Sequence, residues 1–387
     1  MLRAFLILIF FGLINLYAAA RIIGRWPWAA RHMTGAWLVV LVFFVLQMLA
    51  PFGDRLVFKK LRKRPHMAAI VSALDWISYT AFGVMSLLVV YGIAIDIVRI
   101  ALQLADPYFN LSIFDHYALY AIFTVTLATT VTGIAYVLRG PQVVSVTVPL
   151  AHLPPALDGF RIVQISDLHV GAAIRKRYVQ NVVDIANGLE PDLIALTGDF
   201  VDGGVDDLME DVTPLSALRA PEGVFFVTGN HEYYSGVHQW LGAFEQLGAR
   251  ILLNAHVVIR RGKDAFVLAG VTDHKASDIV PDHATDPATA IAGAPAGLVN
   301  ILLAHQPFSY REAAKAGFDV QLSGHAHGGQ YFPFTFLVRF FQHYYTGLEK
   351  YKNMWIYVSH GTGYWGPPFR TGTPCEITLI TLRRTCL

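Results

Sequence analysis

The chain has 387 residues, of which 54% are hydrophobic and only 15% charged, and this balance excludes an ordinary soluble globular protein. The formal net charge of +2 conceals an asymmetry, because the first 140 residues carry 12 basic and 5 acidic side chains and the remainder carries 18 and 23. The acidic C-terminal part has no basic run longer than Arg175-Lys176-Arg177, so no nucleic-acid partner is expected.

The apolar excess lies in the first 140 residues, which contain no glutamate. A membrane-spanning helix needs ~20 mostly apolar residues. Four uncharged runs approach or meet this length, at residues 4–20, 35–50, 76–95 and 117–138. We therefore expect residues 1–140 to form a transmembrane helical anchor of about four spans.

The first of these runs has an alternative interpretation as a cleaved signal peptide. Arg3 supplies a short positive n-region, and Ala18, Ala19 and Ala20 satisfy the small-residue rule for cleavage. The choice does not change the side on which the C-terminal part lies, because the later three spans determine it.

The basic loop at residues 51–67 predicts that side. It carries six basic residues against one acid, Asp54; they are Arg55, Lys59, Lys60, Arg62, Lys63 and Arg64. In a four-span arrangement Arg3 and Arg139 join them, whereas the opposite side has four arginines. The excess of eight over four predicts a multi-pass protein of the inner (cell) membrane, with its C-terminal domain in the cytoplasm.

Residues 141–157 are predicted to be a linker, with a strand-like alternation at 143–148 and three prolines that prevent a continuous helix. Residues 158–387 then form the C-terminal domain. Helical patterns at 178–189, 208–218 and 238–247 alternate there with short apolar runs, so an α/β fold is expected. The cysteines, Cys375 and Cys386, are too few for a disulfide framework, and core or surface positions are expected for them.

Five of those apolar runs end in a tight turn that carries polar side chains. Asp167 and His169 follow the run 162–166, Asp199 and Asp202 follow 193–197, and Asn230 and His231 follow 223–228. His305 follows the run 301–304, and His325 and His327 follow 319–323. Ligand sites in α/β sheets lie at the carboxyl ends of strands, so the five turns should converge. Carboxylate, imidazole and amide donors without thiolate suit a pair of divalent metals, Mn²⁺, Fe or Zn²⁺, that activates water against a phosphate.

The order of these motifs, Asp-x-His, Gly-Asp-x-x-Asp, Gly-Asn-His-Glu, His and Gly-His-x-His, resembles the calcineurin-like metallophosphoesterase superfamily. The tail from Tyr357 to Gly363, with Pro367, Arg370 and Glu376, is more similar to its bacterial membrane-associated branch. The resemblance covers roughly residues 158–382 and implies a four-layer αββα sandwich. It also implies two divalent metal ions, with Mn²⁺ favoured.

The resemblance assigns a role to each polar residue. Asp167, His169 and His327 would hold the first metal, and Asn230, His305 and His325 the second, while Asp199 would bridge the two. His231 matches the catalytic histidine beside the leaving group, and Asp202 the carboxylate that orients it. One departure is that Gly203 and Gly204 stand where the family's protein phosphatases have Arg-Gly, which argues against protein phosphatase activity.

The expected activity is hydrolysis of a phosphate ester or pyrophosphate bond by a metal-bound hydroxide, with His231 as general acid. An aromatic stretch follows the last metal motif, and in it Phe336, Phe340 and Phe341 share one predicted helical face with Leu337 and Tyr344. This face is either core or a contact with membrane lipid or an acyl chain. The favoured substrate is therefore a lipid or lipid-linked phosphate ester.

Two other functions remain open. One is a phosphodiesterase on soluble, nucleotide-like substrates that the anchor merely localises. The other is a non-catalytic membrane sensor or transport-associated binding domain. The pairing of His231 with Asp202 argues against the second, because a binding module has no need of a general acid.

Overall fold

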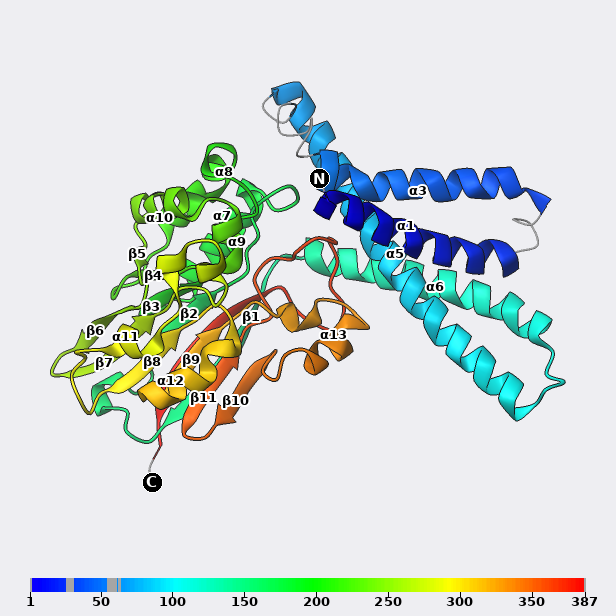
Figure 1. The fold of residues 1–387 in the computed structure, drawn as a ribbon. Coiled ribbons are helices and arrows are strands. Elements are labelled where there is room, and N and C mark those ends of the chain that lie inside the picture. Colours follow the sequence, from blue (N-terminus) through cyan, green and yellow to red (C-terminus); the bar gives the residue numbers. More distant parts are fainter. Residues whose placement is uncertain (1, 26–30, 54–60, 62–63, 386–387) are drawn as a thin grey trace. The chain divides into compact units, whose positions relative to one another are not determined.

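A computed structural model describes residues 2–25, 31–53, 61 and 64–385 of the chain, which divides into two compact units (Figure 1). One unit, called here the helical unit, comprises Met1–Ala135 and Gly366–Phe369. The other, called the sandwich unit, comprises Tyr136–Trp365 and Arg370–Leu387. Cys386 lies outside the described residues.

Four long helices lie in the described part of the helical unit, the last of them extending into the sandwich unit: α1 (Leu2–Arg25), α3 (Met33–Gly53), α5 (Pro65–Ala105) and α6 (Leu111–Leu138). Each predicted apolar run falls within one of them. α1 packs against α3 and α5, and the buried amides of Asn15 and Gln47 exchange hydrogen bonds of 3.2 and 2.9 Å between α1 and α3. Asp96 of α5 accepts a hydrogen bond from Tyr17 of α1 at 2.9 Å and forms an ion pair with Arg21 at 3.0 Å.

Among the described residues, two helices, His66–Ala105 and Leu111–Leu138, are long and apolar enough to cross a membrane. Leu8–Ile23 and Met33–Leu49 are shorter apolar helices, so two of the four expected spans meet this criterion. Helix α5 has 41 residues, about 60 Å at 1.5 Å per residue, which is roughly twice the hydrocarbon thickness of a bilayer. Of the basic loop, residues 54–60 and 62–63 lie outside the described residues, and Arg64 directly precedes α5.

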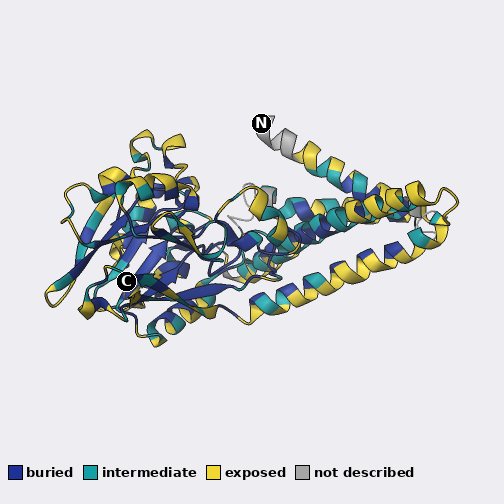
Figure 2. Cartoon of the chain, turned by 90° about the horizontal axis from the view of Figure 1, so that it is seen from below, coloured by how far each residue is buried: buried dark blue, intermediate teal, exposed yellow. Residues whose placement is uncertain are grey.

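Many apolar side chains of the helical unit are exposed, as the yellow stretches along its helices show (Figure 2). They include Leu104 (81% exposed), Leu127, Val131 and Val39. A protein surrounded only by water rarely leaves so much apolar surface uncovered.

The sandwich unit contains two six-stranded sheets (Figure 1). The strand order of the first is β1 (Gln142–Leu150), β12 (Glu376–Arg384), β2 (Arg161–Ile165), β3 (Leu193–Thr197), β4 (Val224–Val227) and β5 (Arg250–Ile251). The order of the second is β10 (Gly347–Tyr351), β11 (Met354–Val358), β9 (Val320–Ser323), β8 (Val299–Leu303), β7 (Asp264–Gly270) and β6 (Ala255–Arg261). β2, β3 and β4 are mutually parallel, as are β7, β8 and β9.

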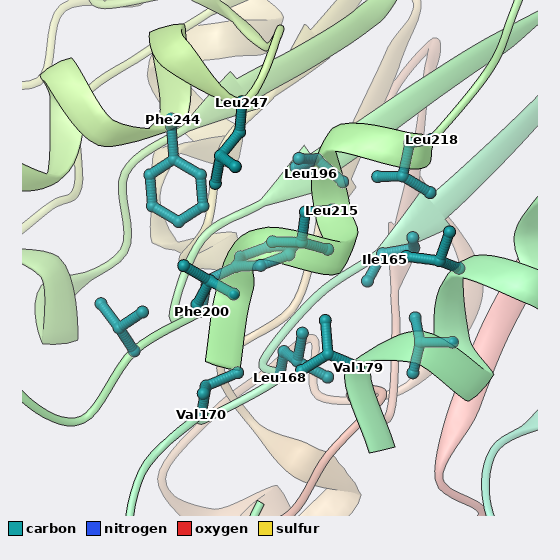
Figure 3. Close-up of a cluster of buried hydrophobic side chains, with 14 of the residues drawn as sticks. Ile165, Leu168, Val170, Val179, Leu196, Phe200, Leu215, Leu218, Phe244 and Leu247 are labelled. Atoms are coloured by element: carbon teal, nitrogen blue, oxygen red, sulfur yellow. The ribbon is translucent and has the colours of Figure 1, made fainter. Parts of the chain in front are cut away.

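Three apolar clusters define the layers. In β3, Ile194 and Leu196 face the outer cluster with α7 (Lys176–Gly188), α8 (Val205–Val212) and α10 (Val237–Gln246), whereas Leu193 and Ala195 face the second sheet. Figure 3 shows Leu196 and Ile165 of the strands beside Val179 of α7 and Phe244 of α10. On the far side Leu302 of β8 packs in a third cluster with residues of α11 (Pro287–Ile291) and α12 (Tyr310–Ala316). The unit is thus a sandwich of two sheets with helices on both outer faces.

The strand-like alternation expected at residues 143–148 and the helical face expected after the last motif have different outcomes. The segment expected as a linker contains β1, which pairs in parallel with β12 as the edge strand of the first sheet. The expected helical face after the last motif consists instead of two short turns, α13 (Phe334–Leu337) and a 3₁₀ turn at Val338–Phe340. Tyr344, which was expected on that face, is buried in the third cluster, whereas Phe336, Phe340 and Phe341 are exposed.

Candidate metal centre

The five polar turns meet at the carboxyl ends of the two groups of parallel strands. Asp167 and His169 follow β2, Asp199 follows β3, and Asn230 opens α9 (Asn230–Tyr234) after β4. From the second sheet, His305 follows β8, and His325 and His327 follow β9. Parallel strands present these ends at the same edge, so the turns lie together and their side chains form two clusters.

The first cluster consists of Asp167, His169 and His327, all buried. The Nε2 atoms of His169 and His327 are 3.0 Å apart, and Asp167 Oδ1 lies 3.5 Å from His327 Nε2. Three donor atoms therefore point at one small volume, as the ligands of a metal ion do.

The second cluster consists of Asp199, His305 and His325. His305 Nε2 lies 3.0 Å from Asp199 Oδ2 and 3.2 Å from His325 Nδ1. Asn230, also assigned to the second metal by sequence, has its Oδ1 atom buried with no hydrogen-bond partner among the described residues. A buried amide oxygen without a partner is costly, and a cation would satisfy it.

Backbone geometry sets these residues apart. Among the seven residues predicted as ligands, five have a positive φ: Asp167, His169, Asp199, His325 and His327, with values of 50–72°. A residue with a Cβ atom is destabilised by roughly 1–2 kcal/mol in the left-handed region of backbone conformation. The surrounding structure must therefore hold these five residues in that conformation. Such a concentration of unfavourable backbone is typical of functional sites.

The motif glycines allow the turns to approach one another closely. A Cβ atom on Gly324 would lie 2.0 Å from Ser166 Oγ and 2.1 Å from Asp167 Oδ2. A Cβ atom on Gly229 would lie 2.2 Å from Asp199 Oδ1. Any larger residue at Gly324 or Gly229 would clash with the neighbouring carboxylate, so both positions require glycine.

The protonation pattern of the clusters calls for a cation. His305 donates from Nδ1 to the carbonyl oxygen of Thr197 at 2.8 Å, so the lone pair of its neutral ring faces the carboxylate of Asp199. Burial opposes a charge on His305, yet Asp199 outweighs burial and raises its pKa well above the usual range, so a proton occupies this lone pair unless a metal ion takes its place. Burial and His305 together lower the pKa of His325 to about 3, which leaves that ring neutral. Oxygen and neutral imidazole donors in two adjacent clusters fit a pair of divalent ions.

His231 and Asp202 form a separate group beside the first cluster. Asp202 Oδ1 accepts hydrogen bonds from His231 Nδ1 at 2.7 Å and from His169 Nδ1 at 2.9 Å. Although burial lowers the pKa of His231, the bond to Asp202 and the charge of Asp199 outweigh it and raise this pKa to about 9. Burial alone would raise the pKa of Asp202. The imidazoles of His169 and His231 outweigh this effect and hold the pKa of Asp202 below the usual range. Asp202 thus favours the protonated form of His231 and holds its ring beside the two clusters, with Nε2 4.0 Å from Asp199 Oδ2.

Two further residues support the site and carried no individual expectation. The buried carboxylate of Glu232 accepts hydrogen bonds from the backbone of Asp199 (3.0 Å), Phe200 (2.7 Å) and Gly229 (2.7 Å), and so joins the turns after β3 and β4. Its place three residues after Gly229 is the spacing of a capping box, which was a usable signal. Arg370 is fully buried and its guanidinium lies 2.9 Å from His327 Nδ1.

Comparison with known proteins identifies the family. Residues 160–329 match the model of the calcineurin-like phosphoesterases. A metallophosphoesterase of Aquifex aeolicus is 34% identical over 239 residues, which cover 61% of this chain and 90% of the relative. The chain belongs to the calcineurin-like phosphoesterase family.

Other members of this family are named as membrane proteins. A zebrafish (Danio rerio) protein described as a transmembrane protein with metallophosphoesterase domain is 35% identical over 268 residues. The protein of the same description from Bos taurus is 36% identical over 270 residues. Each match covers 67% of this chain, and the chain spans 61% of the length of each of these two relatives.

Proposed function

We propose that this chain is a membrane-anchored phosphoesterase with a binuclear metal centre, and that it hydrolyses a phosphate ester or pyrophosphate bond of a lipid or lipid-linked substrate. The observation that carries the proposal is the convergence of seven residues, all but His325 buried, into two adjacent clusters of donor atoms: Asp167, His169, Asp199, Asn230, His305, His325 and His327. The first ion would be held by the first cluster, the second by His305, His325 and Asn230, with Asp199 as the bridge. Two divalent ions there would bind phosphoryl oxygens and activate water for attack on phosphorus.

His231 supplies the proton that the leaving group needs. Its Nδ1 is held by Asp202, so its Nε2 is free to donate to the oxygen that departs as the bond from phosphorus breaks. Against the effect of burial, the hydrogen bond to Asp202 raises the pKa of His231, which favours the protonated ring before the reaction. Asp202 favours this charged form and fixes the orientation of the ring.

The helical unit supports the membrane part of the proposal. Its two long apolar helices and its exposed apolar side chains suit a lipid environment better than water. We propose four spans in all, with α1 and α3 as the two shorter ones, and a cytoplasmic sandwich unit because of the basic residues before α5.

The exposed phenylalanines support a lipid substrate. Phe340 and Phe341 are 68% and 78% exposed, and they follow the metal-cluster residue His327 closely along the chain. The guanidinium of Arg339 lies over the ring of Phe336 at 4.7 Å, so the same surface pairs a cation with apolar rings. Such a surface suits an acyl chain with an anionic head group.

The test is turnover by the purified full-length chain in detergent, after metal removal and after addition of Mn²⁺, Fe²⁺ or Zn²⁺. The substrates are model monoesters and diesters, a nucleoside 2′,3′-cyclic phosphate, and a lipid pyrophosphate. We expect metal-dependent hydrolysis and the highest kcat/KM on the lipid pyrophosphate. Faster turnover of the cyclic nucleotide would favour a soluble substrate, and metal binding without any turnover would contradict the proposed activity.

A further inference from the structure

Two exposed aromatic side chains stand beside the imidazole of His231. The ring centroid of Tyr234 lies 5.5 Å from that of His231, and the centroid of Trp365 lies 6.1 Å from it on a different segment of the chain. Both rings are steeply inclined to the imidazole, at 61° and 79°. Tyr234 is 63% exposed and Trp365 is 56% exposed, so most of each ring is open to solvent.

The position of Trp365 is imposed by a dedicated contact. The side-chain amide of Gln330 accepts a hydrogen bond from Trp365 N at 3.0 Å and donates one to Trp365 O at 3.1 Å. Gln330 is itself buried, has a positive φ of 61°, and lies three residues after His327. Its carbonyl oxygen accepts from Thr371 N at 3.1 Å and from Thr373 Oγ1 at 2.8 Å. The turn that carries a metal-cluster residue therefore also fixes the backbone of Trp365.

An open tryptophan fixed in this way adds little to the packing of the core. Its uncovered apolar surface is unfavourable in water and becomes favourable when an apolar group covers it. The place where a ligand would cover both rings is next to His231, where the proton donor of the reaction must meet the substrate.

From this geometry we infer that Tyr234 and Trp365 form a subsite for the leaving group, and that this group has an apolar, ring-like or chain-like, surface next to the phosphate. The inference rests on the proposed function, because it takes His231 as the donor to the leaving oxygen. That oxygen must come within about 3 Å of His231 Nε2, so the atoms attached to it pass between or along the two rings. Hydrolysis itself is unchanged: the oxygen of water becomes bound to phosphorus as the bond from phosphorus to the leaving oxygen breaks. The leaving oxygen takes the proton of His231, and the proton that the water releases to solvent balances the one that His231 takes up again.

The experiment measures binding rather than turnover. Ethyl-, n-hexyl- and benzylphosphonate cannot be hydrolysed, and each places its organic group where the leaving group would lie. Their dissociation constants for the metal-loaded, full-length chain are measured by calorimetry. We expect benzyl- or n-hexylphosphonate to bind about tenfold more tightly than ethylphosphonate, and the better of the two distinguishes a ring from a chain.

Variants assign that preference to the two rings. Trp365→Ala should reduce the tenfold preference to about twofold or less, and Tyr234→Ala should reduce it in part. Trp365→Phe keeps a ring and should preserve most of it. Gln330→Met keeps the length of the side chain but removes both hydrogen bonds to Trp365. It should reduce the preference as well, but by less than Trp365→Ala. Phe308→Ala removes an exposed ring elsewhere in the sandwich unit and serves as the matched control.

Equal affinities for the three phosphonates would overturn the inference, as would a preference that survives in the Trp365→Ala, Tyr234→Ala double variant. Metal content and thermal unfolding of each variant show whether it is folded, and Trp365→Phe keeps the test decisive if the alanine variant unfolds. Failure of the proposed function would appear differently, as a chain that binds phosphonates selectively but hydrolyses no phosphate ester.

Discussion

Asp202 serves two imidazoles with one oxygen atom. Its Oδ1 accepts from His231, the proposed proton donor, and from His169 of the first metal cluster. By accepting from Nδ1 of His169 it leaves the Nε2 lone pair of that ring free to bind a metal. In the proposed mechanism, proton donation and metal affinity would therefore be linked through a single carboxylate.

His231→Ala should retain both metals and lower kcat on alkyl phosphate esters by about 10²–10⁴-fold, because a poor leaving group needs the proton. An activated nitrophenyl ester should be much less affected. Asp202→Asn should follow the same pattern more mildly, with weaker metal binding through His169. Steady-state kinetics on both kinds of ester check this, and equal losses on the two would remove His231 from the role of acid.

Asp199→Asn should cause the largest loss of metal of any single ligand change. One oxygen of its carboxylate lies 3.0 Å from His305 Nε2, and the other accepts a hydrogen bond from the backbone N–H of His231 at 2.8 Å. Both oxygens therefore contact residues of the site. As the proposed bridge it would hold both ions, and neutralising it weakens both sites. Metal analysis of the dialysed variant is the measurement, and two ions still bound at full occupancy would refute the bridging role.

At the scale of elements, Glu232 connects the turns that follow β3 and β4. Glu232→Gln replaces one accepting oxygen by an N–H₂ group that faces backbone N–H donors, so at least one buried donor loses its partner. We expect the free energy of unfolding to fall by about 1–3 kcal/mol, together with weaker metal binding. Denaturant unfolding and metal titration check this against Glu245→Gln, an exposed glutamate on α10. An unchanged stability would mean that the turns hold without the carboxylate.

The exposed segment around α13 gives a second prediction at this scale. Changing Phe336, Phe340 and Phe341 together to Ser should raise KM for a lipid substrate by about tenfold or more, because the apolar contact is lost. Turnover of a small soluble diester should change far less, and Phe308→Ser is the control for an exposed ring outside this surface. Should both activities fall together with the melting temperature, these rings stabilise the fold and do not bind lipid.

Strands and turns were predictable because their signals are local. An apolar run followed by Gly and a polar residue identifies β3 with Asp199 or β9 with His325 without any long-range information. The supporting contacts are not local: Arg370 reaches His327 across 43 residues, and Gln330 reaches Trp365 across 35. No spacing in the sequence encodes such pairs. The prediction of one helical face in the aromatic stretch after residue 330 was wrong, because the chain forms two short turns there instead of a continuous helix.

At the scale of the whole molecule, the proposed membrane orientation rests on the basic residues before α5. We predict that a reporter fused after Leu387 is active on the cytoplasmic side. Replacing the six basic residues between positions 55 and 64 by Gln should weaken this orientation, because they carry most of the charge bias. Replacing Arg21, Arg25, Arg31 and Arg99 is the matched control and should not reverse it. A reporter active only on the outer side would overturn the topology.

The pairing of β1 with β12 has a consequence for biosynthesis. β1 is the first strand of the sandwich unit to be made, yet its partner in the sheet begins at Glu376, 226 residues after Leu150. At about 5–20 residues per second, the ribosome needs roughly 11–45 s for that interval. During this time an open strand edge, which is prone to pair with other chains, remains directly behind α6 on the nascent polypeptide. We expect a chaperone to shield β1 until translation supplies β12, the strand that joins it to the sheet.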